Sequence, residues 1–225
     1  MDIASPQLTR RQRNRQASIA EILDAARAQM RAEGAAALNL NEVARRVGLR
    51  PPSLYEYFPG GKHAVYDALF AQGFTLFGEL MRSATATDDP LEALRRSIET
   101  YLRFAVEQPD LYQLCFERPV PGFVPSDESL RISFGVLAEG YSALERAMAQ
   151  LGNPLGLTVE EAQNLLIALT HGIAALHLAN EPHLPPGEGR FGSLIPAATA
   201  VLRLVLPPAE SRPTVQGTTP EGARP

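Results

Sequence analysis

The stretch that decides the fold is NLNEVARRVGLRPPSLYEYFPGGK, residues 39–62. Its first half places leucine, valine and alanine at helical spacing, which predicts one buried face. Asn39 can cap this helix because its side-chain oxygen accepts a hydrogen bond from a free first-turn N–H, and Glu42 completes the capping-box spacing. Gly48 then ends the helix, since glycine tolerates the left-handed conformation that such an end often needs.

The second half of the stretch predicts another short helix. Pro51 and Pro52 suit only a first turn, where missing N–H groups cost little. Leu54 and Phe58 form an apolar stripe, and Pro59 with the two glycines after it ends the element. Two short helices around a glycine turn are what a helix-turn-helix needs to enter a DNA major groove. An ordinary helical hairpin in an all-α core would show the same pattern.

At these residues the sequence becomes similar to a known family. The segment 17–73 resembles the N-terminal domain of TetR/AcrR-type transcriptional regulators. The resemblance lies in the order and spacing of Ile22-Leu23-Asp24-Ala25-Ala26, Glu42-Val43-Ala44, Val47-Gly48-Leu49, Ser53-Leu54-Tyr55-Glu56-Tyr57-Phe58-Pro59 and Gly61-Lys62.

The resemblance implies an all-α protein of about nine helices, with a three-helix helix-turn-helix domain and a larger C-terminal helical domain for ligand binding and dimerisation. We expect a basic, largely disordered arm at 1–15, the helix-turn-helix domain at 16–62, the C-terminal domain at 63–206 and a disordered tail at 207–225. The tail follows from its Pro/Gly/Thr-rich composition. His171-Gly172 resembles the His-Gly pair of one subgroup of the family's C-terminal domains.

Charge is distributed unevenly along the chain. The whole sequence of 225 residues carries a net charge of −4, but residues 1–62 hold 10 Arg or Lys against 6 Asp or Glu, whereas residues 63–225 hold 11 against 19. A locally basic module suits DNA because phosphate attraction depends on local charge. The four arginines within residues 9–15 are either a solvated basic tail or an arm that reaches phosphates or a minor groove.

The expected DNA contacts come from the resemblance and from side-chain chemistry. Arg50 can pair with a guanine edge. Ser18, near the start of a helix predicted at 17–33, could donate to a phosphate or only cap the helix. Lys62, at the start of a helix predicted at 62–83, matches a phosphate-contacting lysine of the family. The full expected set is Arg13, Arg15, Ser18, Asn39, Asn41, Arg45, Arg50, Pro51, Pro52, Ser53, Tyr55, Tyr57 and Lys62.

The remainder of the chain also has helical periodicity. The last two long helices are apolar around much of their circumference, so the rest of the core or another chain must cover them. In the family, the last two helices form a four-helix bundle across a two-fold axis, which implies a homodimer. The further helices are predicted at 90–107, 111–117, 127–151, 160–180 and 190–206.

The resemblance also implies a small-molecule pocket among the C-terminal helices. Aromatic residues with a few polar tips would suit a mostly apolar effector, although each could equally be core. His171 is either a core histidine bonded to backbone or a ligand contact. Cys115 would sense redox state only if exposed with a lowered pKa; otherwise it is a packing residue. The candidate pocket residues are Tyr101, Phe104, Tyr112, Phe116, Phe134, Tyr141 and His171.

Enzymatic motifs are missing from the sequence: it has no phosphate-binding glycine loop, no GxSxG, no HExxH and no zinc-type Cys/His cluster. We therefore expect no enzyme, no cofactor and no metal. A single cysteine, without a signal peptide or a membrane span, predicts a cytoplasmic protein. The expected function is a homodimeric, ligand-responsive regulator, most simply a repressor, on a palindromic operator. The alternative is a helical small-molecule sensor or interaction module that does not bind DNA.

Overall fold

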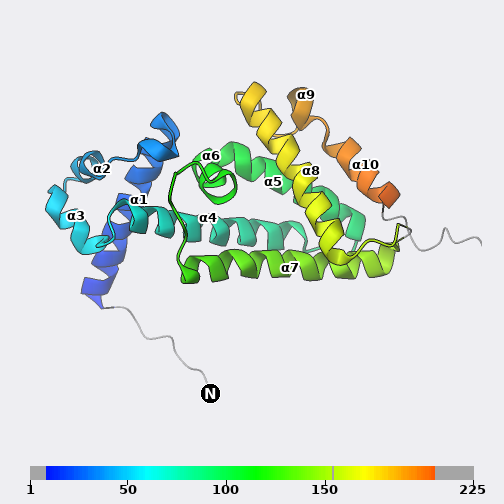
Figure 1. Ribbon diagram of the computed structural model, residues 1–225, viewed down its shortest axis with the longest axis horizontal. Helices are drawn as coiled ribbons and strands as arrows, with labels where there is room; N and C mark the ends of the chain where they lie inside the picture. Colours follow the sequence, from blue (N-terminus) through cyan, green and yellow to red (C-terminus); the bar gives the residue numbers. More distant parts are fainter. Residues whose placement is uncertain (1–8, 154, 206–225) are drawn as a thin grey trace, which may run out of the picture.

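The computed structural model describes residues 9–153 and 155–205, and every regular element within them is helical. The helices form a head (α1–α3) at one end and a longer body (α4–α10), as Figure 1 shows. The prediction of an all-α fold with about nine helices is confirmed. Residues 1–8 of the predicted arm and the predicted tail 207–225 lie outside the described residues. The elements are α1 (Arg10–Glu33), the 3-10 turn η1 (Ala35–Ala37), α2 (Leu40–Arg46), α3 (Pro51–Tyr57), α4 (Lys62–Ala84), α5 (Pro90–Glu107), α6 (Pro109–Tyr112), the π-helical turn η2 (Gln113–Glu117), α7 (Asp127–Leu151), α8 (Val159–Asn180), α9 (Gly189–Gly192) and α10 (Ile195–Val205).

Helix α1 begins earlier than predicted. Residues 10–15, expected to belong to a disordered arm, form its first turns. The cause is a capping box: the Thr9 hydroxyl accepts the N–H of Gln12, and the Gln12 side chain accepts the N–H of Thr9. Because the helix starts at Arg10, Ser18 lies in its interior and is half-buried, so Ser18 does not cap it.

The turn between α2 and α3 follows the sequence closely. The Asn39 side chain accepts the N–H of Asn41 at 3.0 Å, as predicted, but Glu42 does not complete a capping box. The Asn39 N–H instead donates to the side chain of Gln29, which is 2% exposed on α1, at 3.0 Å. Gly48 adopts φ +68°, the left-handed conformation expected at this helix end.

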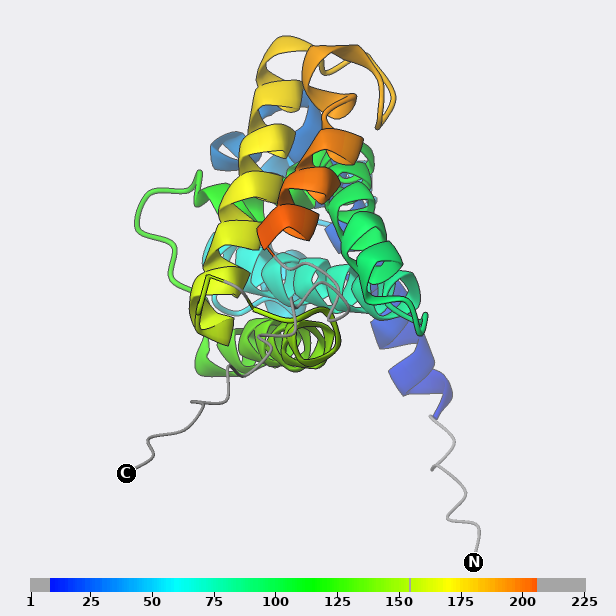
Figure 2. The same cartoon turned by 90° about the vertical axis from the view of Figure 1, so that its right-hand side faces the viewer.

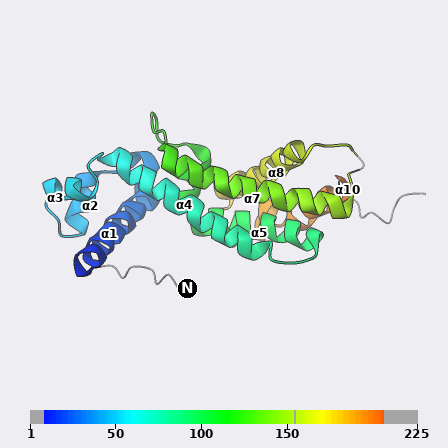
Figure 3. The ribbon, with the colours of Figure 1, turned by 90° about the horizontal axis from the view of Figure 1, so that it is seen from below.

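Helix α4 joins the head to the body and runs alongside α7, as Figure 3 shows. Two polar contacts tie this pair together. Near the start of α4, Asp67 accepts the N–H and the hydroxyl of Ser126, the residue that caps α7. Near its end, Arg82 lies 2.9 Å from Glu139. The buried apolar residues of α4 belong to one hydrophobic core that extends through both head and body.

Helix α8 packs against α5 and α7, and α10 packs against α5; Figure 2 shows α8 and α10 side by side on one side of the body. By length and composition alone α8 could cross a membrane, which is weak evidence because core helices pass the same test. A capping box between Thr158 and Glu161 starts α8. The cap and the contacts with α5 and α7 make α8 an integral part of the helical body.

Two short helices differ from the prediction. The expected helix 190–206 is divided into α9 and α10, with a break at 193–194. Pro196 stands at the second position of α10, where a proline starts a helix readily but cannot continue one from the preceding turn. The helix predicted at 111–117 begins earlier, at Pro109, as α6, which then continues into the π-helical turn η2.

Candidate functional site

The exposed face of the head is formed by α3. Leu54 and Phe58, 0% and 6% exposed, anchor this helix in the core. Pro51 and Pro52 at its start are exposed, and Tyr55 retains 49% of its accessible surface. α3 therefore presents a rigid helix start and an aromatic side chain to solvent.

Arg15 is held within the head. Its guanidinium lies 3.4 Å from the carbonyl oxygen of Glu56 and 5.3 Å from the centre of the Tyr57 ring. Arg15 therefore connects α1 to the C-terminal end of α3 and orients Tyr57, an arrangement that a flexible arm could not provide. We therefore interpret Arg15 as a residue that stabilises the position of α3, and not as part of a flexible arm.

The basic residues beside α3 differ in their partners. Arg45 is 75% exposed and lies 2.7 Å from Glu42. Hydrogen bonds from Arg45 and Arg46 lower the pKa of Glu42 to about 2, so the carboxylate is charged at neutral pH. An exposed ion pair of this kind is screened by water and stabilises the fold little, so Arg45 can exchange its partner for another anion. Lys62, the first residue of α4, is exposed.

The structure brings most of the expected DNA-facing residues to the surface of the head. Ser18, Ser53 and Tyr57 are half-buried, and Arg15 is engaged with α3. The remaining members of the set are exposed: Arg13, Asn39, Asn41, Arg45, Arg50, Pro51, Pro52, Tyr55 and Lys62.

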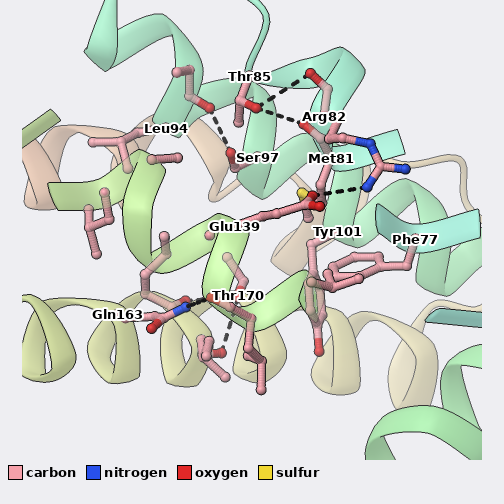
Figure 4. Close-up of a pocket in the computed structure, with 18 of the residues that line it drawn as sticks. Phe77, Met81, Arg82, Thr85, Leu94, Ser97, Tyr101, Glu139, Gln163 and Thr170 are labelled. Carbon is pink, nitrogen blue, oxygen red and sulfur yellow. Dashed lines mark hydrogen bonds and ion pairs between the residues drawn. The ribbon is translucent and has the colours of Figure 1, made fainter. Parts of the chain in front are cut away.

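The body contains a cavity of about 430 Å³ between α4, α5, α7 and α8. Figure 4 shows Phe77 and Tyr101 side by side in its wall; their rings are perpendicular, with centroids 5.6 Å apart. Its walls are mainly apolar, and they include Phe74, Phe77, Met81, Leu94, Tyr101, Phe116, Leu137, Leu144, Leu166 and Ile167.

The six aromatic Phe and Tyr residues of the predicted pocket separate into three groups. Tyr101 and Phe116 line the cavity. Phe104 and Tyr112, 1% and 0% exposed, are core residues that do not line it. Phe134 and Tyr141 were expected in the pocket, but they are 61% and 39% exposed on α7 and do not line it; the helical period turns both away from the neighbouring cavity residues of α7.

His171 holds the two tyrosines and does not line the cavity. Its Nδ1 lies 3.2 Å from the hydroxyl of Tyr101 and 3.1 Å from that of Tyr112. Burial is the main factor that raises the pKa of both phenols, so both remain neutral and can donate. His171 therefore has two side-chain partners and not the backbone partner expected for a core histidine. These contacts hold the Tyr101 hydroxyl against His171 of α8.

Cys115 is a buried packing residue. It is 8% exposed, and its thiol lies 3.7 Å from the carbonyl oxygen of Phe70. Burial raises the pKa of the thiol, so the reactive thiolate is disfavoured. A redox role for Cys115 has no support in this geometry.

Sequence reading missed the polar cluster between head and body. Asp110, at the start of α6, has no exposed side-chain surface and accepts hydrogen bonds from Arg27 at 2.7 Å and Arg31 at 2.8 Å, both on α1. Gln108 accepts from the same two guanidiniums. The i, i+4 spacing of Arg27 and Arg31 places both on one face of α1, which is a signal in the sequence. Their partner Asp110 lies 83 and 79 positions away in the chain, so no local pattern identifies it.

Metal-binding groups of three or more His, Cys, Asp or Glu side chains are absent from residues 9–153 and 155–205.

Residues 22–69 match the family described as bacterial regulatory proteins, tetR family, and residues 94–191 match the tetracyclin repressor-like C-terminal domain. The fold and the head therefore define a helix-turn-helix regulator with a helical C-terminal domain. The chain belongs to the TetR family. No curated protein matches it.

Solved structures share this fold over most of the chain. Protein SCO4313 is 26% identical with a TM-score of 0.69, covering 86% of this chain and 98% of that one. The TetR family transcriptional regulator PfmR from Thermus thermophilus is 19% identical with a TM-score of 0.61, covering 82% and 96%. AibR, in complex with isovaleryl coenzyme A and operator DNA, is 17% identical with a TM-score of 0.60, covering 84% and 98%.

Proposed function

We propose that this protein is a cytoplasmic, homodimeric transcriptional repressor that binds a palindromic operator and is released by a small molecule. The observation that carries the proposal is α3, anchored by Leu54 and Phe58 while Pro51, Pro52 and Tyr55 face solvent. A helix presented in this way suits the major groove. The function is regulatory and not enzymatic.

Within this proposal the head residues have different tasks. Arg50, exposed at the N-cap of α3 without a capping bond, reads a guanine edge. Asn41 and Lys62 contact phosphates from the starts of α2 and α4, and Arg45 joins them by exchanging Glu42 for phosphate. Arg15 acts indirectly, by positioning Tyr57 and the end of α3. Arg13 contributes from the exposed basic turns of α1.

The exposed apolar surface of α8 and α10 supports the homodimer. Only 28% of the most apolar part of α8 is buried within one chain. Leu165 and Leu176 on α8 are 52% and 47% exposed, and Val201 on α10 is 54% exposed. Apolar helix faces of this size require cover, and pairing α8 and α10 with their copies in a second chain would supply it. A two-fold dimer then matches a palindromic operator.

The cavity and the polar cluster suggest how a ligand would act on the head. Phe116 of the cavity wall belongs to the same short segment as Asp110, which holds Arg27 and Arg31 of α1. The cavity is also lined by α4, which enters the head. A ligand that favours a different position of α4 and α6 would move the two heads apart. It must bind the non-DNA-binding state more tightly, or the equilibrium does not shift.

The decisive experiment is repeated selection from a random double-stranded DNA pool with the purified full chain at a stated salt concentration. Enrichment of an inverted repeat supports the proposal, because it requires both base reading and a two-fold dimer. Binding that is only salt-sensitive and sequence-independent, or none at all, contradicts it and favours a sensor module without DNA binding. The enriched operator then serves to test ligands for release.

A further inference from the structure

The polar groups that line the cavity are already hydrogen-bonded within the protein. The hydroxyl of Ser97 donates to the carbonyl oxygen of Ala93 at 2.8 Å, one turn earlier in α5. Thr170 likewise donates to the carbonyl oxygen of Leu166 at 2.8 Å in α8, and Thr85 donates to that of Met81 at 2.9 Å; Figure 4 shows these three side chains in the wall. Each hydroxyl proton is directed into its own helix and not into the cavity.

The longer polar side chains of the wall are paired as well. Gln163 of α8 donates to the carbonyl oxygen of Leu137 on α7 at 2.9 Å. The hydroxyl of Tyr101 is engaged with His171 at 3.2 Å, so the tyrosine contributes its ring to the wall.

The two charged side chains of the wall, Arg82 and Glu139, lie 2.9 Å apart and are both about half exposed. A carboxylate or phosphate placed at Arg82 would also meet the negative charge of Glu139, so the pair as a whole does not attract an anion. The wall therefore offers no net charge to an ionic ligand.

We propose that this cavity takes an uncharged, predominantly hydrocarbon molecule, bound by apolar contact without a required hydrogen bond. The inference rests on the proposed function in treating the cavity as the effector site. A ligand that accepted hydrogen bonds from the three wall hydroxyls would have to break their bonds to the helix carbonyls, so it would gain little from them. A hydrocarbon leaves all of these bonds intact and gains from the burial of apolar surface.

The volume indicates the size of the part of the molecule that the cavity encloses; the cavity opens to solvent beside Arg82 and Glu139. A cavity of about 430 Å³ holds roughly 14 atoms if each occupies ~30 Å³, the share of a water molecule in the liquid. A coenzyme A thioester is much larger and carries phosphates, for which the wall has only Arg82, already paired with Glu139. The isovaleryl coenzyme A bound by AibR therefore represents a different ligand class.

The test compares uncharged and charged probes that share the same hydrocarbon part, on the purified full chain without DNA. The alkyl set is methyl octanoate, octanoate and octanoyl coenzyme A; the aryl pair is 2-methoxynaphthalene and 2-naphthoate. Calorimetry and thermal unfolding should show at least one uncharged probe binding at least about tenfold more tightly than its charged counterpart, because an unpaired charge is costly to desolvate. Tighter binding of a carboxylate or of the thioester, or binding of no probe, would overturn the proposal.

Variants test whether the ligand uses the polar groups. Thr170→Val and Ser97→Ala remove wall hydroxyls and should change the affinity of the bound uncharged probe by less than about twofold, since neither group is available to it. Ala143→Phe fills the cavity and should abolish binding, whereas Phe134→Ala, on the exposed face of α7, should leave it unchanged. Circular dichroism and thermal unfolding verify that each variant folds. A tenfold loss in Thr170→Val or Ser97→Ala would contradict the proposal.

This experiment separates the ligand class from the proposed function. Probe binding is measured without DNA, and operator selection is measured without probe. If an inverted repeat is enriched and only charged probes bind, the repressor proposal stands and the ligand class is wrong. If uncharged probes bind and no inverted repeat is enriched, the ligand class stands and the protein is a sensor without DNA binding.

Discussion

The Asp110 carboxylate at the start of α6 lies 2.7 Å from Nε of Arg27 on α1, and none of the Asp110 side chain is exposed. This ion pair joins the head to the body across 83 positions of sequence. Arg31 provides a second contact with the same carboxylate. Because the carboxylate is buried, its charge is compensated only while the head remains docked on the body.

Replacing Asp110 should therefore destabilise the protein strongly. In Asp110→Asn, Arg27 and Arg31 lose the charge that compensates them, and breaking a buried pair in this way costs about 3–5 kcal/mol. Urea unfolding measures the difference. Glu139→Gln removes the half-exposed partner of Arg82 and should cost less than ~1 kcal/mol. Equal losses in the two variants would show that the Asp110 cluster is not a structural clamp.

The same cluster predicts a pH dependence. Burial raises the pKa of Asp110, but the hydrogen bonds from Arg27 and Arg31 outweigh burial, so the net pKa lies below the ordinary 3.8. As pH falls below about 4, the unfolded chain takes up this proton first, so the contribution to stability is complete at neutral pH and disappears as pH falls through the folded-state pKa. The stability difference between the parent and Asp110→Asn should therefore shrink in acid. A difference that stays constant down to about pH 2 would contradict this assignment.

Gly73 on α4 should not tolerate a side chain. A Cβ at this position would lie 2.5 Å from the sulfur of Cys115 and 3.5 Å from Cβ of Leu111. Gly73→Ala should cost about 1–3 kcal/mol through overpacking, and Cys115→Ala in the same chain should recover part of the loss. Gly135→Ala, on an exposed part of α7 with open space around it, should instead stabilise by about 0.5–1 kcal/mol. Thermal unfolding measures all three, and an unchanged Gly73→Ala would refute the close contact.

Variants of Arg50 and Lys62 should distinguish recognition of a base from binding of a phosphate. Arg50→Ala should lose about 1–3 kcal/mol at one operator base pair and relax the preference there, whereas Lys62→Ala should weaken all sequences uniformly and reduce the salt slope by about 1. Binding titrations on the selected operator and its single-base variants, at several salt concentrations, distinguish the two. An unchanged base preference in Arg50→Ala would remove Arg50 from the reading set.

The dimer proposal depends on the exposed face of α8. Leu165→Glu places a charge in the proposed interface and should convert the dimer to a monomer, because an unpaired charge cannot be buried cheaply. Phe134→Glu, at a side chain of similar exposure on α7, should leave the dimer intact. Sedimentation analysis measures both. Dissociation by Phe134→Glu and not by Leu165→Glu would move the interface to α7.

Much of the local structure could be predicted from the sequence. The Asn39 cap, the left-handed Gly48 and the Thr158 capping box depend on residues within about four positions of each other. Residues 10–15 are helical and not the disordered arm expected, because the capping box of Thr9 and Gln12 starts α1 ahead of the four arginines. The break between α9 and α10 was missed because the high helix propensity of its neighbours obscured Pro196.

By itself the sequence determined the helical elements, their caps and the family resemblance of the head, because hydrogen bonds within one helix turn and apolar periodicity are local properties. Only the tertiary structure decided which aromatic residues line the cavity, that Tyr101 is turned toward His171, and that Asp110 clamps Arg27 and Arg31. These features depend on how α1, α5, α6 and α8 pack. Packing brings together side chains that are 59 to 83 positions apart, a relationship that no local pattern encodes.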